Sequence, residues 1–247
     1  MKAAADEQLR LLDLQSLDTR LDQLAHRRSS LPELAEIAGL DERLTRLRGD
    51  LVRVETQDSD QGREQTKIEN EIDLVRTRAV RDQQRLDAGQ VSSPRELENL
   101  QHEIGSLATR QAELEDRVLE VMERREALQG SAAELAAERD RLTTQRTDAE
   151  QRRDRALAEI AAAAAEATAR RSGLAGELPG DLLTLYEKVR AASGGVGAAA
   201  LHRGRCEGCH LSLSGSELAG VRAAAEDEVV RCDECRRILV RTAESGV

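Results

Sequence analysis

The residues of this chain best suited to chemistry are four cysteines, all within its last 42 residues. They form two Cys-x-x-Cys motifs, Cys206–Cys209 and Cys232–Cys235, which are separated by 22 residues. Two such pairs at this separation are typical of one tetrahedral zinc site, because each pair places two thiolates on a tight turn. The spacing therefore predicts one structural Zn²⁺ held by Cys206, Cys209, Cys232 and Cys235.

Two other chemistries use paired cysteines. Disulfides need an oxidising compartment, and the N-terminal segment has no apolar signal core. A redox-active pair is expected within a thioredoxin-like βαβ pattern, which the sequence lacks. His202 and His210 lie beside the first motif as alternative ligands, but four thiolates already complete a tetrahedron. Because such a site is closed, its metal would stabilise the fold and would not activate water.

The composition argues against an enzyme. The chain has 247 residues, of which 34% are charged, and Tyr186 is its only aromatic residue. Large aromatics supply much of the buried area of a globular core, whereas Ala, Glu, Leu and Arg predominate in long helices. No Gly-rich phosphate loop and no catalytic constellation is present. We therefore predict a protein without enzymatic activity.

The formal charge of −10 disfavours binding to nucleic acid or to anionic membranes. No apolar run has the length that a transmembrane helix needs. These features predict a cytoplasmic protein with no membrane association.

Apolar residues at alternating spacings of three and four mark two long helical seams. The first extends from Leu40 to Leu86 and the second from Leu97 to Ile160. A sustained 3.5-residue period predicts a left-handed supercoil. Between the seams, Gly89 and Ser93-Pro94 are signals for a helix end and a helix start. Arms of similar length on either side predict an antiparallel hairpin with its tip near residues 88–94. A homodimer, in which the helices pair between chains, is the alternative.

Polar residues interrupt the first seam at Asp58, Gln61 and Gln65. In a hairpin with this tip, they would face the segment from Val118 to Arg125. A polar layer of this kind costs stability and fixes register, which is the role we predict for it.

The C-terminal part has the pattern of a small α+β module. We expect a short helix over 182–191, a flexible loop over 193–197, and strands over 211–213, 229–231 and 238–241. Ser214 and Glu217 form a capping box for a helix that ends near Ala225. The predicted fold is therefore mainly α. Residues 1–175 form an antiparallel coiled-coil hairpin, and residues 176–247 form a short helix plus a C4 zinc ribbon.

Arginines near the cysteines are candidate contacts for RNA or DNA. Residues 201–247 hold seven Arg and eight acidic residues, and no aromatic residue is present there to stack an unpaired base. A solvated surface, with some Arg neutralising the thiolates, explains them at least as well. The candidate nucleic-acid contacts are Arg203, Arg205, Arg231, Arg236, Arg237 and Arg241.

Several motifs together resemble a known family. They are Ser93-Pro-Arg-Glu-Leu-Glu-Asn-Leu-Gln-His-Glu-Ile104, Leu178-Pro-Gly-Asp-Leu-Leu-Thr-Leu-Tyr-Glu-Lys-Val-Arg190, Cys206-Glu-Gly-Cys209 and Cys232-Asp-Glu-Cys235-Arg-Arg-Ile-Leu239. The chain resembles the bacterial C4-type zinc-ribbon proteins built on a long coiled-coil hairpin. The resemblance implies a hairpin plus ribbon with a protein-binding or nucleic-acid-binding role. Some members look like chaperones or adaptors of flagellar or type III secretion systems, and RNA binding has been proposed.

These observations lead to two hypotheses about function. The first is a non-enzymatic adaptor or chaperone-like module that binds other proteins. The alternative is a regulator that binds RNA or DNA through the arginines of the zinc ribbon.

Overall fold

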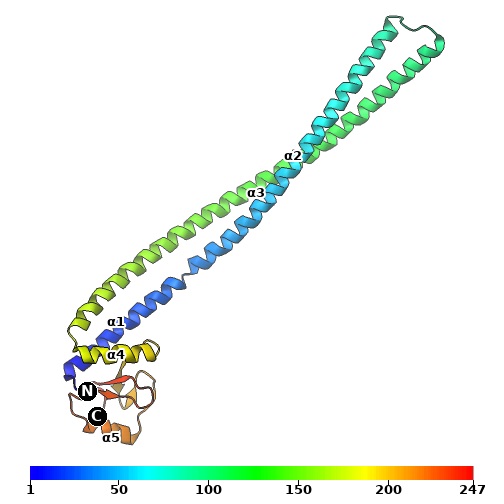
Figure 1. Cartoon of the computed structure of the whole chain (residues 1–247). Coiled ribbons are helices and arrows are strands. Elements are labelled where there is room, and N and C mark those ends of the chain that lie inside the picture. Colours follow the sequence, from blue (N-terminus) through cyan, green and yellow to red (C-terminus); the bar gives the residue numbers. More distant parts are fainter. Residues whose placement is uncertain (247) are drawn as a thin grey trace. The chain divides into compact units, whose positions relative to one another are not determined.

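A computed structural model describes residues 1–246 of the chain; Val247, the last residue of the predicted ribbon domain, lies outside the described residues. The described residues divide into two compact units, residues 1–34 with 151–246, and Ala35–Glu150. Figure 1 labels the elements, which are α1 (Ala5–Ser29), α2 (Pro32–Asp87), α3 (Pro94–Gly176), α4 (Gly180–Ala192), β1 (Ala198–His202), β2 (Arg205–Cys206), α5 (Gly215–Ala223), β3 (Val230–Arg231) and β4 (Ile238–Arg241).

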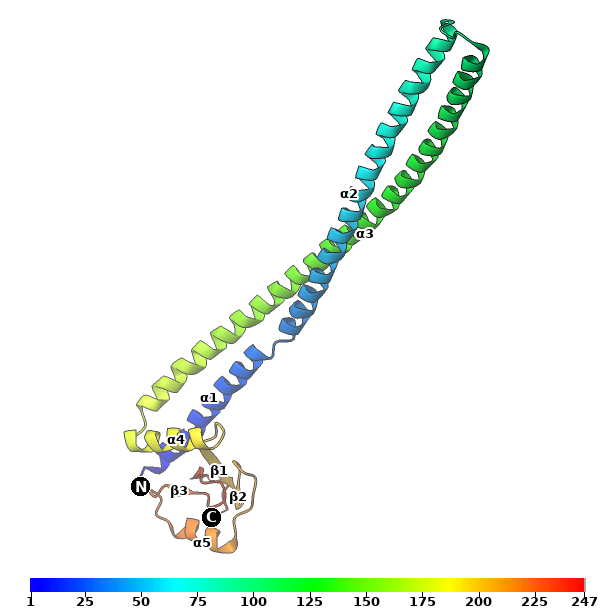
Figure 2. The same cartoon turned by 45° about the vertical axis from the view of Figure 1, so that its right-hand side comes forward.

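In the unit Ala35–Glu150, α2 and α3 lie side by side and antiparallel, as the cyan and green ribbons show (Figures 1 and 2). Their buried residues are those of the predicted seams. One cluster joins Leu40, Leu44 and Leu47 to Leu142, and a second joins Ile68 and Ile72 to Leu114 and Val121. The predicted hairpin, a mainly α fold, is thereby confirmed. None of the helices in residues 1–246 is long and apolar enough to cross a membrane.

The turn between the two long helices uses the residues expected to break them. Gly89 has a φ of 65°, a left-handed conformation that glycine adopts without a steric penalty. Ser93 Oγ accepts a hydrogen bond from the Glu96 N–H at 3.2 Å, and Glu96 Oε2 accepts one from the Ser92 N–H at 3.0 Å. These reciprocal bonds satisfy backbone donors at the start of α3.

A ladder of ion pairs follows the seam in the half nearest the turn. Its members on α2 lie seven residues apart, and so do their partners on α3, because side chains at heptad spacing share one face. The pairs are Glu64–Arg117 at 3.4 Å, Glu71–Arg110 at 3.6 Å, Arg78–Glu103, and Arg85–Glu96 at 3.8 Å.

The predicted polar layer is present. Arg125 Nε lies 3.0 Å from Asp58 Oδ1, and its Nη1 donates to Gln65 Oε1 at 3.0 Å. Gly62 faces this guanidinium, and a Cβ at that position would lie in ordinary van der Waals contact with Arg125 Cζ, at 3.4 Å. The layer therefore lies opposite the segment that the sequence indicated.

The other unit contains a four-stranded sheet of order β2-β1-β4-β3, in which β1 and β4 are parallel and the other neighbours are antiparallel. The predicted capping box starts α5, with Ser214 Oγ accepting from the Glu217 N–H at 3.3 Å. The expectation of a strand over 211–213 was wrong, because only Ser212 forms an isolated bridge, to Arg205. Strand β1 was not expected; its Ala-Ala-Ala-Leu-His sequence has no alternation of apolar and polar residues.

Tyr186 lies at the centre of this unit and is fully buried. Around it pack Leu11 and Leu14 of α1, Leu182 of α4 and Ile238 of β4. Gly197, just before β1, touches the Tyr186 ring so closely that a Cβ there would lie only 2.8 Å from ring atoms. The single aromatic residue therefore joins α1, α4 and the sheet.

Candidate metal centre

The two Cys-x-x-Cys turns bring four sulfur atoms together. All four Sγ atoms lie within 4.8 Å of one another. Contacts between the turns join Cys206 to Cys235 and Cys209 to Cys232, each at 3.9 Å. All four cysteines are free thiols, so the disulfide alternative has no support in this geometry.

Both turns have the same backbone geometry. The His210 N–H donates to the Cys206 carbonyl at 2.7 Å, and the Arg236 N–H donates to the Cys232 carbonyl at 2.8 Å. Each turn ends in a left-handed residue, with φ values of 60° for His210 and 61° for Arg236. The tight turn aims both sulfurs of a pair to the same side.

The electrostatic environment of the sulfurs differs from one to the next. Burial raises the pKa of Cys206 to about 12, although backbone N–H groups of Gly208 and Cys209 act against this. Burial also raises the pKa of Cys232. At Cys235 burial acts in the same direction, but hydrogen bonds from Arg237, Cys232 and Cys209 together outweigh it, and the pKa falls to about 7. Since zinc binds thiolates, loading the site must displace protons from the buried thiols.

The two histidines beside the first turn lie outside the sulfur cluster. His202 Nδ1 contacts Glu244 at 3.1 Å, and His210, which is exposed, lies 3.9 Å from Glu207. Within residues 1–246, the group of potential metal ligands contains the four cysteines alone. Four thiolates make a closed tetrahedral site, whose metal stabilises the fold.

Two of the candidate nucleic-acid-binding arginines are used inside the ribbon. Arg237 donates to the carbonyls of Val196 at 3.1 Å and Ser193 at 2.7 Å, and it also lowers the pKa of Cys235. It therefore ties the loop over 193–197 to the thiolate cluster.

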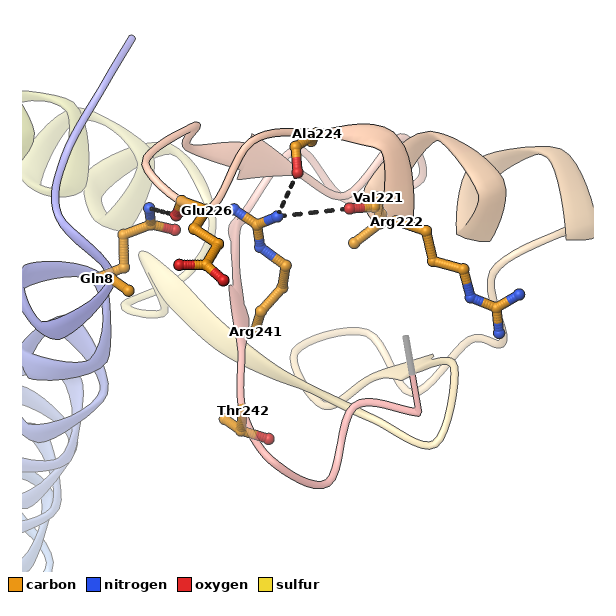
Figure 3. A pocket seen from close by; sticks show the side chains of 8 residues that line it. Gln8, Val221, Arg222, Ala224, Glu226, Arg241 and Thr242 are labelled. Atoms are coloured by element: carbon orange, nitrogen blue, oxygen red, sulfur yellow. Dashed lines mark hydrogen bonds between the residues drawn. The ribbon is translucent and has the colours of Figure 1, made fainter.

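The Arg241 guanidinium donates hydrogen bonds to carbonyl groups in the last turn of α5 and in the segment after it. Figure 3 shows its guanidinium reaching Ala224 and Val221, and it also donates to Ala225, Glu226 and Glu228 at distances of 2.6 to 3.0 Å. It lines a cavity of about 310 Å³ together with Gln8, whose Nε2 reaches the Glu226 carbonyl. Because these carbonyls occupy both Nη groups, Arg241 holds this part of the fold together and has no Nη group left without a carbonyl partner.

The remaining candidate arginines lie on the surface. Arg231 Nε donates to the Arg236 carbonyl at 2.7 Å, and the Arg236 side chain lies 3.8 Å from Asp233. Arg203, which follows β1, and Arg205, which begins β2, are exposed. The structure therefore distributes the six arginines over several faces and turns two of them inward.

A buried polar network next to the ribbon was not predicted. Asp18, only 2% exposed, accepts from Tyr186 Oη at 2.7 Å and from Arg171 Nε at 2.6 Å. Gln15 Oε1 accepts from the Gly197 N–H at 2.7 Å, and its Nε2 donates to the Gly195 carbonyl at 3.0 Å. The sequence signal was the pair of polar residues, Gln15 and Asp18, among leucines that recur every three or four residues from Leu14 to Leu24.

Two family models match the chain, a CT398-like coiled-coil hairpin domain over residues 14–194 and a C4-type zinc ribbon domain over residues 205–239. An uncharacterized Mycobacterium tuberculosis protein, Rv2229c, is 41% identical over 98% of both chains. An uncharacterized Mycobacterium leprae protein, ML1638, is 33% identical over 90% of this chain and 94% of its own length.

Solved structures agree with this fold. A protein from Mycobacterium smegmatis has a TM-score of 0.87 and 38% identity, covering 98% of this chain and 100% of its own. CT398 from Chlamydia trachomatis has a TM-score of 0.70 at 18% identity, covering 96% and 98%. The ribbon match and the clustered sulfurs together show one structural zinc ion per chain. The chain thus belongs to the family of CT398-like coiled-coil hairpin proteins that carry a C4-type zinc ribbon.

Proposed function

We propose that this chain is a non-enzymatic adaptor or chaperone-like module that binds other proteins, with Cys206, Cys209, Cys232 and Cys235 as the ligands of its zinc ion. The observation that carries the proposal is that α2 and α3 bury one seam and leave their outer faces exposed. Leu74, Leu119 and Met122 are large apolar side chains on these outer faces. A metal with four thiolate ligands adds stability and no reactivity, which suits an interaction module.

The same proposal assigns a separate binding surface to each of the two predicted domains. Residues 1–175 would present a coiled-coil surface, and residues 176–247 would present the ribbon. Four thiolates persist in a reducing compartment, so we place the protein in the cytoplasm. Protein surfaces are the favoured partners, because the donors of Arg237 and Arg241 point to backbone carbonyls and are not available to phosphate.

Cross-linking in the native host tests this function. The tagged, zinc-loaded chain is cross-linked in cells and purified under denaturing conditions, with and without nuclease treatment. We expect defined protein partners that withstand nuclease, and fewer of them with the double variant Leu119→Glu and Met122→Glu. The matched control is Glu120→Gln, which changes the same turn of α3 without altering its apolar residues. Recovery of RNA or DNA without nuclease-resistant proteins would contradict the proposal.

A further inference from the structure

Strand β3 is an edge of the ribbon sheet, with β4 on one side only. Val230 pairs with Leu239, and the Cys232 N–H donates to the Arg237 carbonyl at 3.0 Å. Backbone groups alternate in direction along an antiparallel strand, so the N–H and C=O of Arg231 point away from β4. An edge with outward backbone groups is a template for another extended segment.

The neighbouring part of this edge already holds such a segment. The Ala3 N–H donates to the Asp227 carbonyl at 2.7 Å, and the Val229 N–H donates to the Met1 carbonyl at 3.1 Å. Lys2 lies opposite Glu228 in this antiparallel bridge. The pairing ends at Val229, and the outward backbone groups of Arg231 have no hydrogen-bond partner within residues 1–246.

A groove of about 350 Å³ lies beside this unpaired position. Its apolar lining comes from Leu213, Val221 and Val230, and Glu217 and Asp233 add carboxylates. Arg231 also lines it with a charged guanidinium, whose Nε is bonded to the Arg236 carbonyl at 2.7 Å, and Asp233 lies 3.8 Å from Arg236, so Glu217 is the main acidic group of the groove. An apolar floor with acidic groups at its margin suits a long side chain with an aliphatic stem and a cationic head.

We propose that β3 and this groove bind an extended segment of a partner protein, which pairs with the backbone of Arg231 and places a Lys or Arg side chain in the groove. In this mode the backbone bonds give affinity and the pocket gives specificity. The acidic margin favours a basic peptide over a phosphate backbone. The inference rests on the proposed adaptor function and adds a site and a partner chemistry to it.

A defined pair of peptides tests the site. The zinc-loaded full chain is titrated with acetyl-Thr-Val-Lys-Val-Thr-amide and with its counterpart carrying Glu in place of Lys, and amide resonances are followed by NMR. We expect the Lys peptide to shift the Arg231 amide and slow its hydrogen exchange, and to bind about tenfold more tightly than the Glu peptide. The double variant Glu217→Gln and Asp233→Asn should remove that preference. Glutamine preserves the capping box of α5.

A matched pair of variants isolates the backbone contact. Arg231→Pro removes the outward N–H, which the β3–β4 ladder does not use, whereas Arg231→Ala retains it. We expect the proline variant to bind the Lys peptide about three- to tenfold more weakly than the alanine variant. A Lys peptide N-methylated at single positions should lose affinity at one of them, and this readout needs no change to the protein.

Equal affinity of the proline and alanine variants and of the N-methylated peptides would overturn the proposal. So would equal binding of the Lys and Glu peptides, or no binding at millimolar concentration. If Arg231→Pro recovers the same cross-linked proteins as the wild type, the docking site is wrong and the adaptor function stands. Absence of nuclease-resistant partners with the wild-type chain would count against the adaptor function instead.

Discussion

Arg236 ends the second zinc turn in a left-handed backbone conformation with a φ of 61°. A non-glycine residue in this region carries a strain of about 1–3 kcal/mol, which the surrounding structure must hold. Its side chain is exposed, with a 3.8 Å contact to Asp233. The left-handed backbone conformation of Arg236 therefore affects the stability of the turn more than its side-chain contact with Asp233 does.

We expect Arg236→Val to lower the free energy of unfolding of the zinc-loaded ribbon by about 1–2 kcal/mol, because a β-branched residue fits this conformation poorly. Arg236→Gly should stay within about 0.5 kcal/mol of the wild type, since relief of strain and greater entropy of the unfolded chain oppose each other. Denaturant unfolding at fixed free zinc measures both. Equal effects of Val and Gly would show that the conformation at this position is unimportant.

At the residue scale, the sequence predicted the cluster of cysteines better than it predicted the hydrogen-bond partners of the arginines. The cluster of Cys206, Cys209, Cys232 and Cys235 follows from local spacing, because each turn is built from adjacent residues. The roles of Arg237 and Arg241 were not predicted, since their carbonyl partners lie on other elements. The sequence does not distinguish an arginine that binds backbone carbonyls within the fold from one that is free to bind phosphate.

At the element scale, Asp82 is an unusual residue of the hairpin, because it is a buried carboxylate. It lies in the seam of α2 between Ala79 and Leu86, is only 2% exposed, and its Oδ2 has no hydrogen-bond partner within residues 1–246. Guanidinium nitrogens of Arg78, Arg81 and Arg85 lie 3.7 to 4.0 Å from its carboxylate. A buried carboxylate with incomplete hydrogen bonding is a cost to stability.

We expect Asp82→Leu to raise the free energy of unfolding of the hairpin by about 1–3 kcal/mol, because it replaces an unsatisfied polar atom with apolar packing. Thermal unfolding followed by circular dichroism measures the change. Asp73→Asn is the control, since Asp73 lies on the exposed face of α2 and should change stability by less than about 0.5 kcal/mol. Destabilisation by Asp82→Leu would show that the Arg contacts outweigh the burial cost.

The polar layer at Asp58 gives the hairpin a predicted dependence on pH. A hydrogen bond from Arg125 lowers the pKa of the Asp58 carboxyl. Because the folded pKa lies below the unfolded value of about 3.9, this stabilisation is present at neutral pH and disappears as pH falls below that value. We expect Asp58→Asn to unfold at a lower temperature than the wild type at pH 7, with the difference shrinking below pH 4. A gap that is constant from pH 7 to pH 3 would contradict the assignment.

Helices were easier to predict than strands in this chain. The heptad seams contain many repeats, so many apolar residues together determine which face of α2 and of α3 is buried. Strand β1 has no such pattern, since Ala198–Ala200 are small residues whose burial comes from pairing with β4. The strand expected over 211–213 had suitable local residues, but the chain pairs there only at Ser212. Tertiary pairing decided these short strands.

At the scale of the whole molecule, the chain contains two compact units with separate cores. The unit Ala35–Glu150 has apolar clusters of its own, and the other unit is organised around Tyr186 and the sulfur cluster. Arg237 connects the second zinc turn to the neighbouring loop, because its carbonyl accepts from the Cys232 N–H and its side chain donates to Val196, next to the Gly197 N–H that donates to Gln15. We therefore expect loss of zinc to disturb the structure beyond the two turns, but only within this unit.

We expect Cys232→Ala to abolish zinc binding and unfold the ribbon, while most of the helical circular dichroism remains, because the seam of α2 and α3 does not depend on the metal. Elemental analysis should fall from one zinc per chain to none, and the amide of Gly197 should lose its protection from hydrogen exchange. His210→Asn, which suits the left-handed backbone and leaves the four thiols intact, should retain the zinc. Loss of zinc from the histidine variant would make His210 a ligand, and a parallel loss of hairpin helicity in Cys232→Ala would show that the two units fold as one.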